Sequence, residues 1–217
     1  MADEQHEFAN FEEFWPFYLS EHMHPTSRAW HFAGITTGVV VAGTMFDGLL
    51  SPAHAAISSK PSKANDVKIL NYALTLEYLE NEFYKEALAK AGLSGDALRA
   101  AQVIQSHEEA HVEFLKTALG KAAVKKPKFD FGTATANQAN FLATAVVLED
   151  TGVSAYAGQG PRLKQAPVVK AALSIHSVEA RHAAFVRELA GKSFAPKAFD
   201  KPASMQKVLK KAGPFIV

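Results

Sequence analysis

Length, composition and charge limit the kinds of site that this chain can carry. Its 217 residues suffice for one domain with a sizeable core and additional segments, and its net charge of +1 gives no electrostatic case for binding nucleic acid. The absence of cysteine excludes disulfides, iron–sulfur clusters, cysteine-ligated zinc and a thiol nucleophile, which leaves histidine and carboxylate side chains for a tight metal site.

The first quarter of the chain consists of two segments. Residues 1–31 are rich in aromatic residues, acids and histidines, whereas residues 32–56 are largely apolar. Residues 32–50 approach the roughly 20 residues needed to cross a bilayer, and residues 53–55 have the small side chains of a signal-peptidase site. Three interpretations stay open: a cleaved export signal, an uncleaved membrane anchor and a buried hairpin helix. We therefore favour an exported, periplasmic or membrane-associated protein over a cytoplasmic one.

A Ser/Lys/Pro-rich linker, residues 57–65, precedes a predicted four-helix domain at residues 66–190. Four segments in this domain repeat apolar residues at helical spacing, namely residues 66–91, 97–119, 137–156 and 167–189. Residues 121–136 are too many for a tight turn and suit a crossover between two antiparallel helix pairs. The tail, residues 191–217, is predicted to contain one short helix at residues 203–212.

The central motif of the chain is a Glu-x-x-His that occurs twice, as Glu108 with His111 and as Glu179 with His182. Residues three apart share a helix face, so each motif presents a carboxylate and an imidazole side by side. The two motifs lie 71 residues apart, each within an apolar helical pattern. His107 and His176 each lie three residues or fewer before a Glu of these motifs; they either support the site from outside the ligand set or are ordinary, partly buried histidines, and we favour the second interpretation.

A second matched pattern lies upstream of each motif. Glu77 precedes Tyr84 by seven residues, and Glu149 precedes Tyr156 by the same spacing. Glu77 and Glu149 are 72 residues apart, almost the spacing of the two Glu-x-x-His motifs. The sequence therefore indicates an internal repeat, in which one helix pair occurs twice.

These residues predict a metal site inside an all-α bundle. When the four apolar stripes face inward, four glutamates and two histidines lie on or beside the buried face. Four unpaired buried carboxylates would be costly and would mostly bind protons, whereas two divalent cations would balance their charge. Oxygen and imidazole ligands suit iron or manganese, and one Glu from each of two helices with Glu-x-x-His from the other two is the pattern of dinuclear carboxylate bundles.

Residues 66–190 resemble ferritin-like domain proteins of the desiccation-related kind and, more widely, the rubrerythrin and bacterioferritin superfamily. The stretch of residues 76–84, with a ligand Glu seven residues before a Tyr, carries this resemblance most clearly. The resemblance implies a ferritin-like four-helix bundle with two iron ions, or manganese ions, per chain. The chain lacks the Cys-rich electron-transfer module of rubrerythrins.

The resemblance also implies a set of six ligands, which are Glu77, Glu108, His111, Glu149, Glu179 and His182. In this set Glu108 and Glu179 bridge the metals, and each metal has one further Glu and one His. Tyr84 and Tyr156 are implied to hydrogen-bond ligand carboxylates across the bundle. Glu80 is an alternative or an extra ligand, because on a helical wheel it lies nearer the centre of the apolar face than Glu77. The matched Glu-to-Tyr spacing favours Glu77.

Residues 11–43 are similar to the opening of the 2-hydroxy-fatty-acid dioxygenase family of membrane proteins, in which histidines bind iron. The corresponding histidines are His22, His24 and His31, but the remaining helices and histidines of that fold are absent. We therefore interpret this stretch as a truncated or fused segment that does not catalyse alone.

Three functional hypotheses follow. The first is an oxidase or ferroxidase whose dinuclear metal site oxidises Fe(II) or reduces oxygen or peroxide. The second is a structural stress-response or desiccation-related bundle with a non-catalytic metal site or none. The third is a membrane-associated enzyme that uses the N-terminal histidines. The expected partners are metal ions, oxygen or peroxide, a membrane at residues 32–50, and further copies of the chain in a homo-oligomer, but no nucleic acid.

Overall fold

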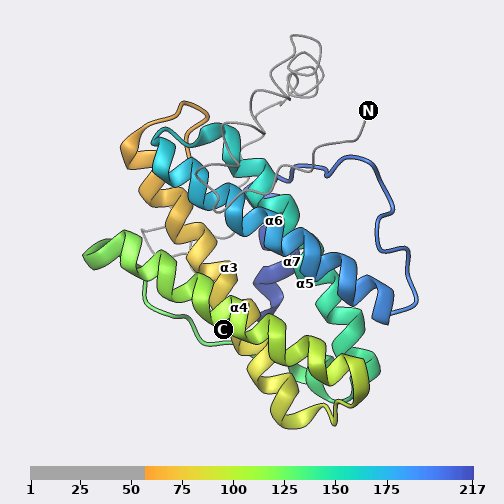
Figure 1. Cartoon of the computed structure of the whole chain (residues 1–217). Coiled ribbons are helices and arrows are strands. Elements are labelled where there is room, and N and C mark those ends of the chain that lie inside the picture. Colours follow the sequence, from red (N-terminus) through yellow and green to blue (C-terminus); the bar gives the residue numbers. More distant parts are fainter. Residues whose placement is uncertain (1–56) are drawn as a thin grey trace, which may run out of the picture. The chain divides into compact units, whose positions relative to one another are not determined.

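A computed structural model of the protein describes residues 57–217, and most of this range is helical (Figure 1). Four long helices and one short helix follow one another: α3 (Lys63–Lys90), α4 (Gly95–Leu119), α5 (Gln138–Gln159), α6 (Ala166–Leu189) and α7 (Met205–Ala212). The two predicted N-terminal segments and their histidines lie outside the described residues. Within residues 57–217, no helix combines the length and the hydropathy needed to span a bilayer.

The four long helices form two antiparallel pairs, as the sequence predicts. Short connections join α3 to α4 and α5 to α6, and the members of each pair pack extensively against one another. The longer connection between α4 and α5 contains two 3-10 turns, Gly120–Ala122 and Gly132–Thr135, and returns the chain so that α5 follows the direction of α4. Because α3 also contacts α5, and α4 contacts α6, the four helices enclose a common interior.

The first helix begins three residues earlier than predicted. Ser62 adopts an extended backbone, and its hydroxyl accepts a hydrogen bond from the backbone N–H of Asn65, so the helix is capped at Ser62. Asp66 is fully buried in the next turn and accepts hydrogen bonds from the backbone N–H groups of Lys164 and Gln165 at 2.8 and 3.0 Å. These bonds tie the start of α3 to the segment that leads into α6.

The two ends of the bundle interior are packed differently. At one end the rings of Phe83, Tyr84, Phe131 and Phe141 contact one another, with the centroids of Phe83 between 5.4 and 5.6 Å from the other three. At the other end a small apolar cavity of about 20 Å³ lies among side chains of α3, α5 and α6. The short helix α7 packs against α5 and covers part of its outer side. The site described next lies between these two ends.

Candidate metal centre

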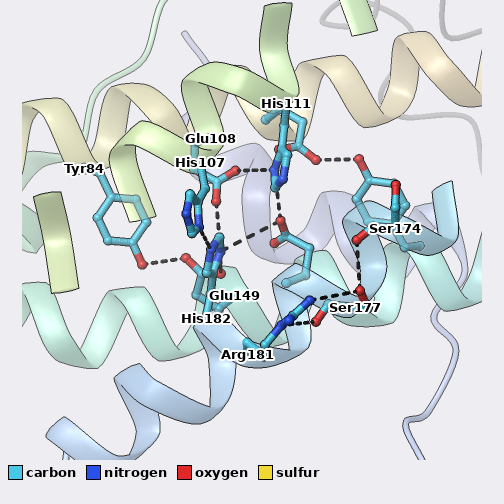
Figure 2. Close-up of polar contacts among 12 residues, drawn as sticks. Tyr84, His107, Glu108, His111, Glu149, Ser174, Ser177, Arg181 and His182 are labelled. Atoms are coloured by element: carbon cyan, nitrogen blue, oxygen red, sulfur yellow. Dashed lines mark hydrogen bonds and ion pairs between the residues drawn. The ribbon is translucent and has the colours of Figure 1, made fainter. Parts of the chain in front are cut away.

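Four glutamates, one from each long helix, meet inside the bundle. Glu77 of α3, Glu108 of α4, Glu149 of α5 and Glu179 of α6 are all 0 % exposed. The helical spacing of apolar residues turns these positions inward, and the antiparallel pairing brings them to the same level, as Figure 2 shows for Glu108 and Glu149. Full burial of four carboxylates is rare in proteins unless each is paired, protonated or bound to a metal.

The two histidines of the repeated motif point into the same cluster. The Nδ1 atom of His111 lies 3.1 Å from Oε2 of Glu77, 3.3 Å from Oε2 of Glu108 and 3.3 Å from Oε1 of Glu179. The Nδ1 atom of His182 lies 3.0 Å from Oε1 of Glu108 and 3.3 Å from Oε2 of Glu149. Each imidazole therefore faces carboxylates from more than one helix, with Nδ1 as the inward atom.

These six residues form two overlapping groups. In each group one ligand atom from every member lies within 4.8 Å of the others. The first group is Glu77, Glu108, His111 and Glu179, and the second is Glu108, Glu149, Glu179 and His182. Glu108 and Glu179 belong to both groups. The structure thus brings together all six predicted residues and makes the two Glu-x-x-His glutamates the shared members.

Several buried atoms of the cluster have no hydrogen-bond partner among the described residues. They are Oε1 of Glu108, Oε2 of Glu149, both carboxylate oxygens of Glu179 and Nδ1 of His182. Some of these atoms approach one another closely, but not in hydrogen-bond geometry. A buried polar atom without a partner is costly, and here such atoms converge from different helices. The donor set, of carboxylate oxygen and imidazole nitrogen, fits divalent iron or manganese.

Burial and mutual repulsion shift the protonation of the carboxylates. Desolvation, followed by the charge of Glu77, raises the pKa of Glu179 to about 8. Desolvation and the charges of Glu179 and Glu77 raise the pKa of Glu108 well above its ordinary value. Burial would also raise the pKa of Glu77, but the hydrogen bond and charge of His111, together with the hydrogen bonds to Glu108 and Tyr156, outweigh burial and lower that pKa. Without cations, therefore, protons and a histidine charge balance this cluster.

Two tyrosines bond the terminal carboxylates across the bundle. The hydroxyl of Tyr84 on α3 donates to Oε1 of Glu149 on α5 at 2.5 Å, and the hydroxyl of Tyr156 on α5 donates to Oε1 of Glu77 on α3 at 2.5 Å. Burial, followed by the charge of the bonded glutamate, raises the pKa of both tyrosines, so both remain protonated donors. Each half of the repeat thus orients a carboxylate of the other half.

Glu80 is the second carboxylate of α3 in this region. It is only 3 % exposed, and desolvation and the charges of Glu179 and Glu149 raise its pKa well above its ordinary value. It belongs to neither of the two ligand groups. The structure therefore brings Glu77, and not Glu80, into a group with His111, while Glu80 lies beside the cluster.

His107 contacts the site, so of the two interpretations from the sequence the one that we did not favour applies to it. Its ring is exposed, yet its Nδ1 lies 2.9 Å from Nε2 of His182, on the side of that ring opposite the cluster (Figure 2). The two rings stack with centroids 5.1 Å apart. His107 is thus not an ordinary partly buried histidine, because it holds the outer nitrogen of a candidate ligand. His176 is partly buried, as predicted.

Comparison with known protein families gives two matches. The model of the ferritin-like domain matches residues 65–192, which is more than half of the chain. The model described as 2-hydroxy-palmitic acid dioxygenase Mpo1-like matches residues 8–76, so it extends into α3 and slightly overlaps the first match. No curated protein matches the chain. Both matches agree with the resemblances that the sequence motifs indicate.

Proposed function

This chain belongs to the ferritin-like domain family, and from that premise we propose that it binds two iron or manganese ions and acts as an oxidase. The proposed reaction is the oxidation of Fe(II), or of another electron donor, with reduction of oxygen or peroxide. One observation carries the proposal: fully buried carboxylate and imidazole atoms without hydrogen-bond partners converge as two groups of four that share two glutamates. Such a pair of groups suits two cations better than one.

We assign the ligands from these groups. Glu77 and His111 would hold one metal, and Glu149 and His182 would hold the other. Glu108 and Glu179 would be shared by both metals, because only these two of the described residues belong to both groups. When bound, the metal pair supplies two one-electron oxidation steps.

The protein's own residues position the ligands and exclude water. Tyr84 and Tyr156 each donate a hydrogen bond to one terminal carboxylate, which leaves the other oxygen of that carboxylate directed at the cluster. The outer nitrogen of His182 is held by His107, so the ring keeps Nδ1 inward. The rings of Phe83 and Phe141 pack around Tyr84 and close that end of the interior to solvent.

A structural role without metal is the second candidate, and one observation favours it. His111 already forms ion pairs with Glu77 and Glu108, and protonated Glu108 and Glu179 would lower the remaining repulsion. Protons would then balance the charge of the buried carboxylates in place of metal ions, and the bundle would have no oxidase activity. The two candidates differ in metal content, which can be measured directly.

The N-terminal match supports a proposal that residues 8–56 derive from a dioxygenase-like membrane protein and direct the chain to a membrane or out of the cytoplasm. We place the oxidase activity in the bundle, because both ligand groups lie within residues 57–217. On this proposal the N-terminal histidines are not required for oxygen reduction.

The first test is metal content per chain. The full chain would be produced with iron and manganese both supplied, and metals would be measured by elemental analysis in the wild type and in a Glu108→Ala/Glu179→Ala variant. We expect close to two metals per chain in the wild type and none in the variant. A Glu109→Ala/Glu188→Ala variant is the matched control, because it removes one exposed glutamate from each of the same two helices.

Oxygen reactivity then separates the oxidase from a structural metal protein. The reduced, metal-loaded wild type is expected to consume oxygen or peroxide on addition of Fe(II), and the double variant is expected to lose this reaction. A wild type that folds normally but resists reconstitution with either metal would contradict the oxidase and leave the structural bundle. A metal-loaded wild type that is inert to both oxidants would leave a metal site that only stabilises the fold.

A further inference from the structure

Gly152 on α5 lies directly against the metal centre. A Cβ atom at this position would lie 2.9 Å from Oε2 of Glu179 and 3.3 Å from Oε1 of Glu80. The first distance is shorter than any normal contact, so a side chain here would displace the Glu179 carboxylate. Two carboxylates therefore occupy the space that any residue other than glycine would fill.

Gly152 is also the counterpart of Glu80 in the internal repeat. Glu80 follows Glu77 by three residues, and Gly152 follows Glu149 by three residues. One half of the repeat therefore has a carboxylate at this position, and the other half has no side chain. The carboxylate of Glu80, in the first half, lies in the space beside Gly152, in the second half.

The position of Glu80 along α3 places it toward one of the two ligand groups. It lies between Glu77 and Tyr84, about 4.5 Å along the helix axis from Glu77 at 1.5 Å per residue. Tyr84 bonds Glu149, so this direction leads from the Glu77 group to the Glu149 group. The contact of Glu80 and Glu179 with the same space at Gly152 agrees with this direction.

We propose that Glu80 is a seventh ligand, that it binds only the metal held by Glu149 and His182, and that Gly152 provides the room for it. This inference rests on the proposed dinuclear site and specifies it further. The two metals then have unequal environments, because one has two terminal carboxylates and the other has one. The negative charge of Glu80 strengthens binding of the cation held by Glu149 and His182, and it favours the higher oxidation state of that cation.

Stepwise binding of Mn(II) to the metal-free full chain tests this inference by isothermal titration calorimetry. We expect two resolved steps in the wild type. Glu80→Gln should weaken one step at least tenfold and leave the other unchanged. Gly152→Ala should weaken both steps without removing any charge, because its methyl group displaces the Glu80 carboxylate and also the Glu179 carboxylate, which belongs to both ligand groups.

Glu82→Gln is the matched control. Glu82 lies on the same helix two residues further on, and its carboxylate pairs with Lys126 at 2.9 Å at the surface, so both steps should keep their wild-type affinities. Wild-type affinities in Glu80→Gln, or an equal loss in both steps, would overturn the inference while the dinuclear site stands. A wild type that binds no Mn(II) and no Fe(II) would instead overturn the proposed function. Far-ultraviolet circular dichroism on each variant confirms that the bundle is folded.

Discussion

The two halves of the bundle, α3 with α4 and α5 with α6, share their ligand pattern but differ beside it. Each half contributes a glutamate, a Glu-x-x-His and a tyrosine, at spacings that agree within one residue. Three differences stand out: Glu80 faces Gly152, His107 has no histidine counterpart, and a cluster of contacting phenylalanine rings packs around Tyr84, whereas a small cavity lies at the other end. The repeat therefore provides two similar groups of candidate ligands, and the departures from it make the two groups unequal.

The largest expected effect is the loss of one metal from either half. Glu77→Ala and Glu149→Ala each remove the terminal carboxylate of one ligand group, so each variant should bind one Mn(II) tightly where the wild type binds two. The step weakened by Glu149→Ala should be the one that Glu80→Gln also weakens. Calorimetric titration of the metal-free variants measures this. Retention of two tight ions in either variant would show that the assignment of terminal ligands is wrong.

The next largest effect concerns the two ends of the interior. Phe141 is 0 % exposed and packs against Phe83 and Tyr84, so Phe141→Ala should lower the free energy of unfolding by about 3–5 kcal/mol. Its counterpart in the repeat is Ile69, which lines the small cavity at the other end. Ile69→Ala should lower the free energy of unfolding by less, because the side chain is smaller and already borders a cavity. Urea unfolding of the metal-free proteins, followed by circular dichroism, compares them. An equal cost at both ends would refute the difference in packing.

Much of this site could be predicted from the sequence because the ligands repeat. The spacing of Glu77 and Glu149 to their tyrosines and the paired Glu-x-x-His motifs place six residues on inner helix faces, and the structure brings these six together. Helix existence followed from apolar periodicity in the same way. Helix bounds differ from the predicted ones by up to three residues: the first helix begins earlier because the cap at Ser62 precedes the apolar pattern, and α5 continues to Gln159.

The remaining features depend on contacts between helices, which a single helix pattern does not contain. His107 lies on an exposed position of α4, and only the packing of α4 on α6 brings its ring to His182. Gly152 has no side chain and thus gives no motif. Its role is visible only when Glu80 and Glu179 are seen to reach the same space. Glu77 and Glu80 are both buried on α3, so burial alone does not distinguish them.

Stability of the metal-free protein should depend on pH. The pKa of Glu179 is about 8 in the folded protein, above its ordinary value of 4.5, so the folded state binds a proton more tightly than the unfolded state. This contribution to stability is complete below about pH 4.5 and is lost as the pH rises to about 8. Metal loading displaces the proton and should reverse the trend, because binding then becomes stronger at higher pH. Melting temperatures from pH 5 to 9, with and without Mn(II), test this. A flat profile for the metal-free protein would contradict it.

The tyrosine bonds should have similar, smaller effects in both halves. Tyr84→Phe removes the donor to Glu149, and Tyr156→Phe removes the donor to Glu77. Loss of a residue that orients a ligand typically costs about 10–100-fold in metal affinity, and each variant should weaken a different step of the Mn(II) titration. Tyr84→Phe should weaken the step that Glu149→Ala weakens, and Tyr156→Phe the step that Glu77→Ala weakens. The opposite assignment would show that the bonds do not cross between the halves as described.

The smallest expected effect tests His107, which acts only on the half that contains His182. His107→Ala frees Nε2 of His182 and lets the ring rotate, so one Mn(II) step should weaken by less than about tenfold. His107→Gln, which can still hydrogen-bond the ring, should recover part of the loss. The matched control is Val178→Ala at the corresponding position before Glu179, and it should leave both steps unchanged. Because His107 is exposed, the metal-free melting temperature should not change in His107→Ala. A lower melting temperature with unchanged metal affinity would assign His107 a purely structural role, whereas a weakened step with an unchanged melting temperature would show that it positions His182.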